Sequence, residues 1–234
     1  MRRMPIPVLH IANRNYSSWS LRPWVLMREL AIPFEERLVP FEPSDRPNPF
    51  LAFSPSGKVP CLHDDDGVVV WDSLAIVERL AERRPDVWPL DAAARAWARS
   101  AAAEMHAGFP TLRAVCSMNC GVRVRLHAVP PALATECARL DALWAEGLDR
   151  FGGPFLAGAS FTAVDAFFAP VAFRAQTYAP PLAPRSLDYV ARLLALPAMR
   201  AWYEAALAEP WRDPEHEADL ARSGTVTEDL RARA

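Results

Sequence analysis

Short apolar runs in the first third of the chain have the length and pattern of β-strands. One run covers Val8–Ala12, and a second, Phe34–Val39, alternates charged with apolar residues. Two further runs lie within Cys61–Trp71, on either side of "DDDG", and Asp66-Gly67 is a typical hairpin turn. The pattern therefore predicts four strands, the last two forming an antiparallel hairpin.

Helical spacing of apolar residues separates and follows these strands. It runs from Leu21 to Leu30 and again from Leu74 to Leu80. The predicted order is β-α-β, a loop or short helix, then β-β-α, ending near Arg84-Pro85. Because a helix crosses over between the first two strands, we expect them to pair in parallel.

From Asp91 onward the apolar spacing is helical, in long stretches rich in alanine, leucine and arginine. The stretch "RRPDVWPLD" contains two prolines and reads as a linker. We therefore expect an α/β domain at residues 1–85, a linker at 86–91 and an all-α domain at 92–234, with the tail after Pro210 ordered or not. The predicted helices are Ala92–Ser117, Pro131–Phe151, Ala163–Tyr178, Ser186–Ala195 and Pro197–Ala208.

Composition narrows the class of protein. The chain has 234 residues, 51% hydrophobic and 23% charged, with a net charge of −2, which gives no electrostatic footprint for nucleic acid. No apolar run approaches the roughly 20 residues that span a bilayer, and "MRRMPIPVLHIA" is too short and proline-broken for a signal peptide. We expect a cytoplasmic protein that binds neither nucleic acid nor membrane.

Cysteine and histidine give little sign of redox or metal chemistry. The four cysteines contain no CxxC pair and are too few for a disulfide scaffold, so we expect reduced thiols. The five histidines are scattered, and none lies at a spacing that would gather a metal. No metal cofactor is expected.

The stretch "NYSSWSLRPW" places three serines where the first strand gives way to a helix. A helix that starts near Ser20 keeps Pro23 in the first turn, where proline is tolerated, so Ser20 is the expected cap. Ser17 and Ser18 then keep hydroxyls that capping does not need, beside the positive end of the helix. That position stabilises an anion or a thiolate.

Two further junctions carry candidate binding groups, although each has an ordinary structural explanation. In "SGKVPCL", Val59-Pro60 opens a strand, where proline is tolerated. In "VWDSLAIVERL", Asp72 and Ser73 are normal helix caps, and the free N–H groups there could equally hold a ligand carboxylate.

Together these three motifs resemble those of the soluble glutathione transferases, which join a thioredoxin-like domain to an all-helical domain. The resemblance covers nearly the whole chain and implies a cytoplasmic, homodimeric transferase whose co-substrate is glutathione. In that family a serine or tyrosine after the first strand hydrogen-bonds the glutathione sulfur, as Ser17 or Ser18 would. The residues implied to bind the rest of the tripeptide are Trp19, Lys58, Val59, Pro60, Asp72 and Ser73, with Val59-Pro60 in the cis form.

Within the family, "SSWSLRPW" is most similar to the serine-containing, bacterial zeta-like type, which isomerises maleylacetoacetate. Trp19 and Lys58 stand where zeta enzymes have cysteine and tend to have glutamine. Counting five residues back from Arg22, as in zeta enzymes, selects Ser17 as the sulfur contact, and counting four, as in delta or theta enzymes, selects Ser18. We favour Ser17, because the Ser-Ser-x-Ser pattern is the zeta one.

The helical half contributes a structural motif and a candidate pocket. Thr162 and Asp165 in "FTAVDAFF" form a Thr-x-x-Asp capping box, which we read as a folding element. The pocket for a small hydrophobic electrophile is expected between the domains. Its candidate residues are Asn15, Met105, His106, Phe109, Arg113 and Tyr178.

The implied chemistry is activation of the glutathione thiol. A serine hydroxyl donating to sulfur at a helix N-terminus favours the thiolate, which is the nucleophile. No GxSxG elbow is present, so the serines are poor hydrolase candidates. Three alternatives stay open: a zeta-type cis-trans isomerase, a non-catalytic glutathione-binding or regulatory protein of the same fold, and a thiol-disulfide reductase. The last is disfavoured because "NYSSWSLR" contains no cysteine.

Overall fold

The first part of the chain folds around a four-stranded sheet. The computed structural model describes residues 6–43 and 45–231, so Arg2 and Arg3 of the N-terminal segment lie outside it. The strand order is β2-β1-β3-β4. β1 pairs in parallel with β2 and antiparallel with β3, and β3 and β4 form the predicted hairpin. The strands are β1 (Val8–Ile11), β2 (Glu35–Leu38), β3 (Cys61–His63) and β4 (Val69–Trp71).

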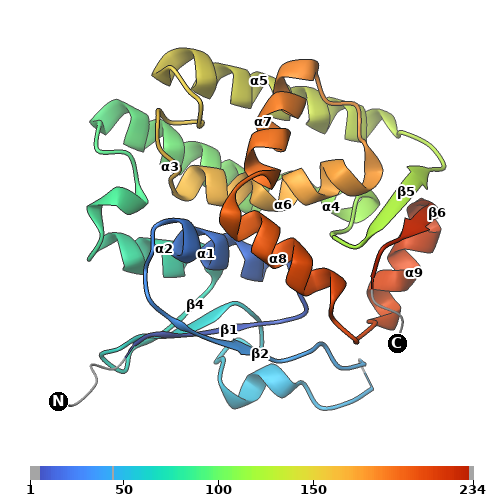
Figure 1. Ribbon diagram of the computed structural model, residues 1–234, viewed down its shortest axis with the longest axis horizontal. Coiled ribbons are helices and arrows are strands. Elements are labelled where there is room, and N and C mark those ends of the chain that lie inside the picture. The colour runs from blue at the N-terminus through green and yellow to red at the C-terminus, as the bar shows by residue number, and fades with distance from the viewer. Residues whose placement is uncertain (1–5, 44, 232–234) are drawn as a thin grey trace.

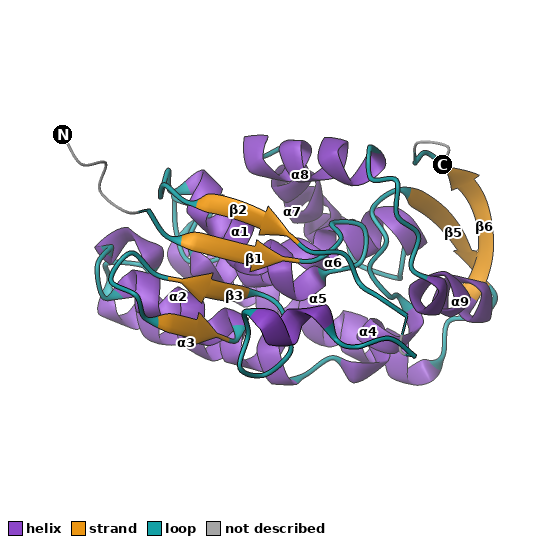
Figure 2. Cartoon of the chain, turned by 90° about the horizontal axis from the view of Figure 1, so that it is seen from below, coloured by secondary structure: helices purple, strands orange, loops and turns teal. Residues whose placement is uncertain are grey.

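Two α-helices lie between this sheet and the rest of the molecule (Figures 1 and 2). They are α1 (Ser18–Glu29) and α2 (Ser73–Ala81), and short 3₁₀ turns cover Pro49–Ala52 and Pro85–Val87. The predicted β-α-β, loop or short helix, β-β-α order is confirmed, as is the parallel pairing of the first two strands.

The predicted start of α1 is wrong by two residues. The helix begins at Ser18, and the carbonyl of Ser17 accepts the N–H of Leu21 at 3.2 Å. Pro23 therefore lies inside the helix, where its missing N–H leaves the carbonyl of Trp19 without its usual partner. The helix tolerates this loss because its apolar face is buried against α6, so tertiary packing outweighs the local cost.

The second part of the chain is helical, which confirms a thioredoxin-like domain joined to a helical domain. The predicted bounds of α5 and α6 are matched, and those of α7 and α8 are met within two residues. The helices are α3 (Ala92–Ala107), α4 (Pro110–Val115), α5 (Pro131–Phe151), α6 (Ala163–Tyr178), α7 (Pro184–Leu194), α8 (Pro197–Leu207) and α9 (Pro214–Ser223).

Two features of this part differ from the prediction. The single helix expected over Ala92–Ser117 is interrupted at Gly108 and Phe109, because Phe109 takes a left-handed conformation (φ 58°) before Pro110, which opens α4. The domain also contains a two-stranded antiparallel sheet of β5 (Val122–Leu126) and β6 (Gly224–Asp229). The described tail after Pro210 is therefore ordered, as α9 and β6.

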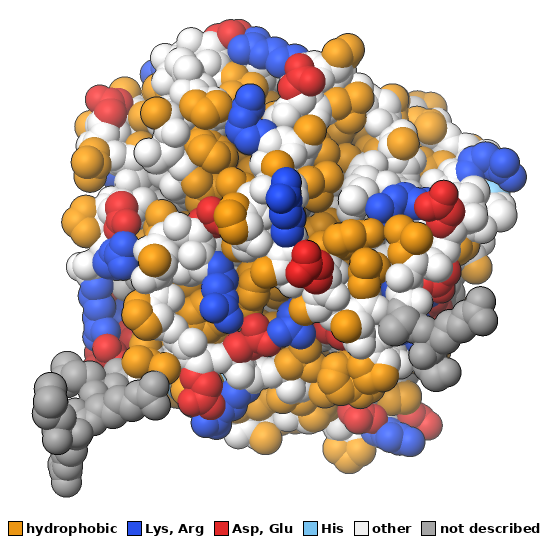
Figure 3. Space-filling view, viewed as in Figure 1, with side chains coloured by type: hydrophobic (Ala, Val, Ile, Leu, Met, Phe, Trp, Pro, Cys, Tyr) orange, Lys and Arg blue, Asp and Glu red, His pale blue; other side chains and the backbone are white. Residues whose placement is uncertain are grey.

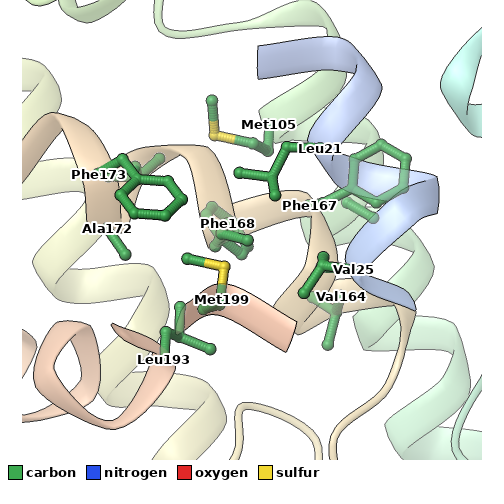
Figure 4. Close-up of a cluster of buried hydrophobic side chains, with 14 of the residues drawn as sticks. Leu21, Val25, Met105, Val164, Phe167, Phe168, Ala172, Phe173, Leu193 and Met199 are labelled. Carbon is green, nitrogen blue, oxygen red and sulfur yellow. The ribbon is translucent and has the colours of Figure 1, made fainter. Parts of the chain in front are cut away.

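Buried side chains of both halves form one continuous hydrophobic cluster. At its centre, Leu21 and Val25 of α1 pack beside Phe167 and Phe168 of α6, with Met199 of α8 close by (Figure 4). Burial of each such side chain contributes about 1.5–3 kcal/mol. The end of α1 that carries the serines is consequently fixed against the helical half.

Surface charge agrees with the near-neutral composition. On the face drawn in Figure 3, acidic and basic side chains are interspersed, and neither sign gathers into a large patch. Within the part of the chain that the structure describes, no helix has both the length and the apolar character needed to cross a membrane.

His10 gives the sheet a built-in sensitivity to acid. His10 is 5% exposed, and its ring stacks on Phe53 at a centroid distance of 4.2 Å and lies 4.7 Å from the ring of His63. Neither ring nitrogen has a hydrogen-bond partner among the described residues. Burial, reinforced by His63, lowers the pKa of His10 from 6.5 to about 4. The unfolded chain therefore binds a proton between pH 6.5 and pH 4 that the folded protein does not bind.

We expect the protein to lose about 2–3 kcal/mol of unfolding free energy through His10 between pH 7 and pH 4.5. Replacing His10 with phenylalanine should remove that part of the loss. Urea unfolding of parent and His10→Phe at both pH values measures it. Equal losses in the two proteins would show that His10 is not the acid-sensitive group.

Candidate functional site

A cleft of about 680 Å³ lies at the N-terminal end of α1, and both halves of the chain line it. The first half provides Tyr16, Ser17, Ser18, Trp19, Phe41, Glu42, Pro43, Arg46, Asn48, Pro49, Phe50, Gly57, Lys58 and Val59. The second half provides Arg113, Ser117, Met118, Arg174, His216 and Asp219.

Ser17 and Ser18 both line the cleft, and neither hydroxyl caps α1. The prediction that Ser20 is the cap is wrong. Ser20 lies within the first turn, and its fully buried oxygen accepts hydrogen bonds from the Ser17 hydroxyl at 2.7 Å and from the Ala12 N–H at 3.3 Å. The Ser18 hydroxyl bonds no other described residue, so this helix end offers two hydroxyls to a ligand.

Tyr16 precedes the serines, but its hydroxyl is hydrogen-bonded to residues near the C-terminal end of the described chain. Its phenol donates a hydrogen bond to Glu217 of α9 at 2.7 Å and accepts one from Arg231 at 3.3 Å. Burial and the Glu217 carboxylate raise the pKa of Tyr16 well above its usual value. A hydroxyl donor to a ligand at this helix end is therefore a serine rather than this tyrosine.

The loop before the serines is held by the helical half. The Glu209 carboxylate, just after α8, accepts the N–H groups of Arg14 at 2.7 Å and Asn15 at 3.2 Å. The Asn15 side chain donates to the carbonyl of Ala206 at 2.6 Å. Asn15, predicted for the electrophile pocket, is completely buried in this junction and does not line the cleft.

The opposite wall of the cleft is the segment before β3. The predicted cis bond at Val59-Pro60 is confirmed. Gly57 has a left-handed conformation (φ 63°), and its carbonyl accepts from the Asn48 side chain at 2.8 Å, which fixes the turn leading to Lys58. Lys58 is exposed and makes no ion pair with any described residue. Its ammonium group is free to bind an anion.

Asp72 and Ser73 lie at the start of α2, outside the residues that line the cleft. Asp72 accepts the N–H of Leu74 at 2.8 Å, so its capping role is confirmed. Ser73 accepts a hydrogen bond from the buried Arg22 at 3.4 Å. His106, predicted for the electrophile pocket, lies here instead, 3.7 Å from Asp72 and edge-on to Trp19, and burial lowers its pKa.

Among the other residues predicted for the electrophile pocket, Arg113 lines the cleft and three do not. Met105, Phe109 and Tyr178 are buried, and the Tyr178 hydroxyl lies 3.3 Å from that of Ser117. Sequence reasoning missed the lining residues Ser117, Met118, Arg174, His216 and Asp219. For Arg174 a signal existed, because it is a charged residue in the mostly apolar stretch "FFAPVAFRA".

Metal and thiol chemistry find little support in the described residues. Asp64, Asp65 and Asp66 are the one described group of three candidate ligands, and Arg79 and Arg83 already pair with these carboxylates. All four cysteines are free and buried, and burial raises the pKa of Cys116 to about 12. Such thiols are poorly reactive.

The order and pairing of the sheet, the cis-proline before β3 and the appended helices define a class of protein, the glutathione transferase architecture. Family models confirm it. The model described as "Glutathione S-transferase, N-terminal domain" matches residues 16–83, and "Glutathione S-transferase, C-terminal domain" matches residues 73–205. The chain belongs to the glutathione S-transferase family.

Individual relatives are distant. The chain is 26% identical over 160 residues to the glutathione S-transferase-like protein OpS6 of Beauveria bassiana (strain ARSEF 2860), covering 63% of this chain and 72% of that protein. A glutathione transferase homologue from Burkholderia gl BGR1, with bound glutathione, superposes with TM-score 0.63 at 24% identity over 86% of this chain and 97% of that one. A tau class enzyme from mango, Mangifera indica, gives TM-score 0.67 at 19% identity over 93% and 97%. At these identities the solved structures establish the fold alone.

Proposed function

We propose that the protein is a glutathione transferase that activates the glutathione thiol for attack on a small electrophile. The observation that carries the proposal is the pair of serine hydroxyls, Ser17 and Ser18, at the N-terminal end of α1 in a cleft shared by both halves. Hydrogen bonding and the helix end both favour a bound thiolate over a thiol, whose free pKa is about 8.5.

The remaining groups suit the tripeptide. The backbone of Val59 would pair with the glutathione backbone, and Lys58, which pairs with no carboxylate of the described residues, would hold the glycyl carboxylate. The N–H groups at the start of α2, with Asp72 and Ser73, would hold the γ-glutamyl end, and Trp19 would pack beside the tripeptide. These assignments leave the Arg113 and Arg174 side of the cleft for the second substrate.

With an aryl halide as second substrate, the thiolate sulfur forms a bond to the ring carbon. The carbon–halogen bond breaks, and the halide leaves with the bonding electron pair. The thiol proton passes to solvent when the thiolate forms. The two serines keep their protons throughout, so their role is to stabilise the sulfur charge.

Calorimetric titration with glutathione and a conjugation assay with 1-chloro-2,4-dinitrobenzene test the proposal. We expect saturable binding of both glutathione and S-methylglutathione, and conjugation faster than the uncatalysed reaction. Binding without turnover of aryl halides, epoxides, peroxides, haloacids or maleylacetone would contradict the enzyme and support a non-catalytic glutathione-binding protein. Isomerisation of maleylacetone would support the zeta-type reaction.

We also propose that the working form is a homodimer. Soluble glutathione transferases pair the first domain of one subunit with the second domain of the other, and in the sheet domain the exposed side chains of Leu51 (66%) and Trp71 (44%) are available for such a contact. Sedimentation equilibrium should give twice the chain mass of 26.0 kDa. A monomeric mass would refute the dimer without touching the proposed activity.

A further inference from the structure

Two arginines form the helical side of the cleft. Arg174 of α6 is 4% exposed, donates through Nη1 to the carbonyl of Cys116, and has no partner for its buried Nε within the part of the chain that the structure describes. Arg113 of α4 is half-buried, donates through Nε to the carbonyl of Gly108 at 3.0 Å and through Nη2 to the carbonyl of Met105, and its guanidinium carbon lies 5.0 Å from the centre of the Trp19 ring. Both line the cleft. Arg113 thus lies beside the residue that follows the two serines.

Neither guanidinium is neutralised by a described carboxylate. Of the two acids that line the cleft, Glu42 pairs with Arg46 at 3.0 Å and Asp219 pairs with Arg222. Glu136 acts on the charge of Arg113 from a distance, but its oxygens accept the N–H groups of Thr111 and Leu112 at the start of α4.

A buried cation that no described carboxylate neutralises is costly, so this wall of the cleft is suited to bind an anion. Burial, together with the charge of Arg113, lowers the pKa of Arg174 to about 10, so Arg174 is still a cation at neutral pH. Buried like charges are normally paired or bound to an anion. The hydroxyl of Ser117, on the same wall, supplies a further hydrogen-bond donor.

We infer that the second substrate is an electrophile bearing a carboxylate, and that Arg113 and Arg174 bind this carboxylate while the electrophilic carbon faces the serines. The inference rests on the proposed function, which assigns the carboxylates of glutathione to Lys58 and to the start of α2. An arginine presents paired N–H donors that match a carboxylate, so the cleft selects organic acids over neutral analogues of the same shape.

A matched pair of substrates tests the inference. 4-Chloro-3-nitrobenzoate and its methyl ester share the reacting carbon and differ in charge, and each enzymatic rate is divided by the uncatalysed rate with glutathione. We expect a higher normalised kcat/KM for the carboxylate. Arg113→Met and Arg174→Met should each lower that value about 10- to 100-fold and change the ester little.

Arg46→Met is the matched control, because Arg46 lines the cleft but is already paired with Glu42. It should affect carboxylate and ester alike. Arg113→Lys, which keeps the charge and loses the planar fork, should retain part of the preference for the carboxylate. Equal loss of both substrates in the methionine variants would overturn the inference.

A binding measurement on the unaltered protein guards against variants that fail to fold. With S-methylglutathione filling the tripeptide site, 4-nitrobenzoate should bind at least about 10-fold more tightly than 4-nitrobenzamide by calorimetry. Equal affinities would overturn the inference. So would loss of S-methylglutathione binding in folded Arg113→Met or Arg174→Met, because the arginines would then hold the tripeptide. If the protein binds no glutathione derivative, the proposed function is wrong, and the inference that rests on it is wrong too. Binding of 4-nitrobenzoate in that case would show only that the cleft contains an anion site.

Discussion

Replacing Asp165 with asparagine is expected to lower the free energy of unfolding by about 3–5 kcal/mol. Asp165 is completely buried at the start of α6. Its carboxylate accepts the N–H groups of Thr162 and Leu156, each at 3.0 Å, and the hydroxyl of Tyr189 at 2.8 Å. Asparagine keeps one acceptor oxygen and turns an N–H donor toward groups that are themselves donors.

Urea unfolding at neutral pH measures the loss, and Asp149→Asn is the control. Asp149 is an exposed partner of Arg185 at 2.5 Å, so its replacement should cost no more than about 1 kcal/mol. A similar effect of the two substitutions would contradict the central role given to Asp165. The sequence identified the Thr162–Asp165 capping box, which is confirmed, but a cap alone is worth about 1 kcal/mol. The larger effect comes from Leu156 and Tyr189, which only the tertiary fold brings to Asp165.

Elements with local signals were predicted accurately. α5 begins at Pro131 and ends before Gly152, which takes a left-handed conformation (φ 78°), and α6 begins directly after Thr162, the first residue of its capping box. The β3–β4 hairpin follows from Asp66-Gly67 in the same way. In each case the residues that set the ends of the element are neighbours in the sequence, so the sequence alone was enough.

Elements that depend on distant parts of the chain were not predicted. The alternation of Val122 and Val124 with Arg123 and Arg125 was a strand signal, but its partner β6 lies about a hundred residues further along the chain. The early start of α1 was missed because burial against α6 outweighs the penalty of Pro23. Intrinsic helix propensity does not include the stabilisation that comes from tertiary packing.

The residues of the candidate site also fall into two groups, those placed by neighbouring residues in the sequence and those placed by distant parts of the chain. Its first-half residues, such as Ser17, Ser18 and Lys58, lie next to turns and helix ends that the sequence marks, and they line the cleft. Arg174 reaches the cleft from the middle of an apolar helix, and Glu209 reaches the serine loop from the end of α8. Their positions follow from helix packing, which a single sequence does not encode locally.

Replacing Ser17 with alanine is expected to raise the pKa of bound glutathione by about 1–2 units, because a hydrogen bond to a charged group is worth about 1.5–3 kcal/mol. Below that pKa, turnover should fall about 10- to 100-fold as the thiolate fraction falls. Affinity for the tripeptide should change little, since this hydrogen bond acts on ionisation. Ultraviolet absorbance of the thiolate against pH, with glutathione bound, measures the shift.

Ser18→Ala and Ser20→Ala are the matched controls. In the structure the Ser17 hydroxyl donates to Ser20, so a thiolate must draw the Ser17 proton toward itself while Ser20 donates to Ser17 in return. A hydroxyl that accepts one hydrogen bond donates the next more strongly, so Ser20→Ala should raise the pKa of bound glutathione by less than Ser17→Ala, and Ser18→Ala should do least. If the pKa of bound glutathione rises in Ser18→Ala and stays unchanged in Ser17→Ala, the Ser18 hydroxyl, which bonds no other described residue, is the one that contacts the sulfur. An unchanged pKa in all three would leave the backbone N–H groups at the start of α1 as the source of thiolate stabilisation.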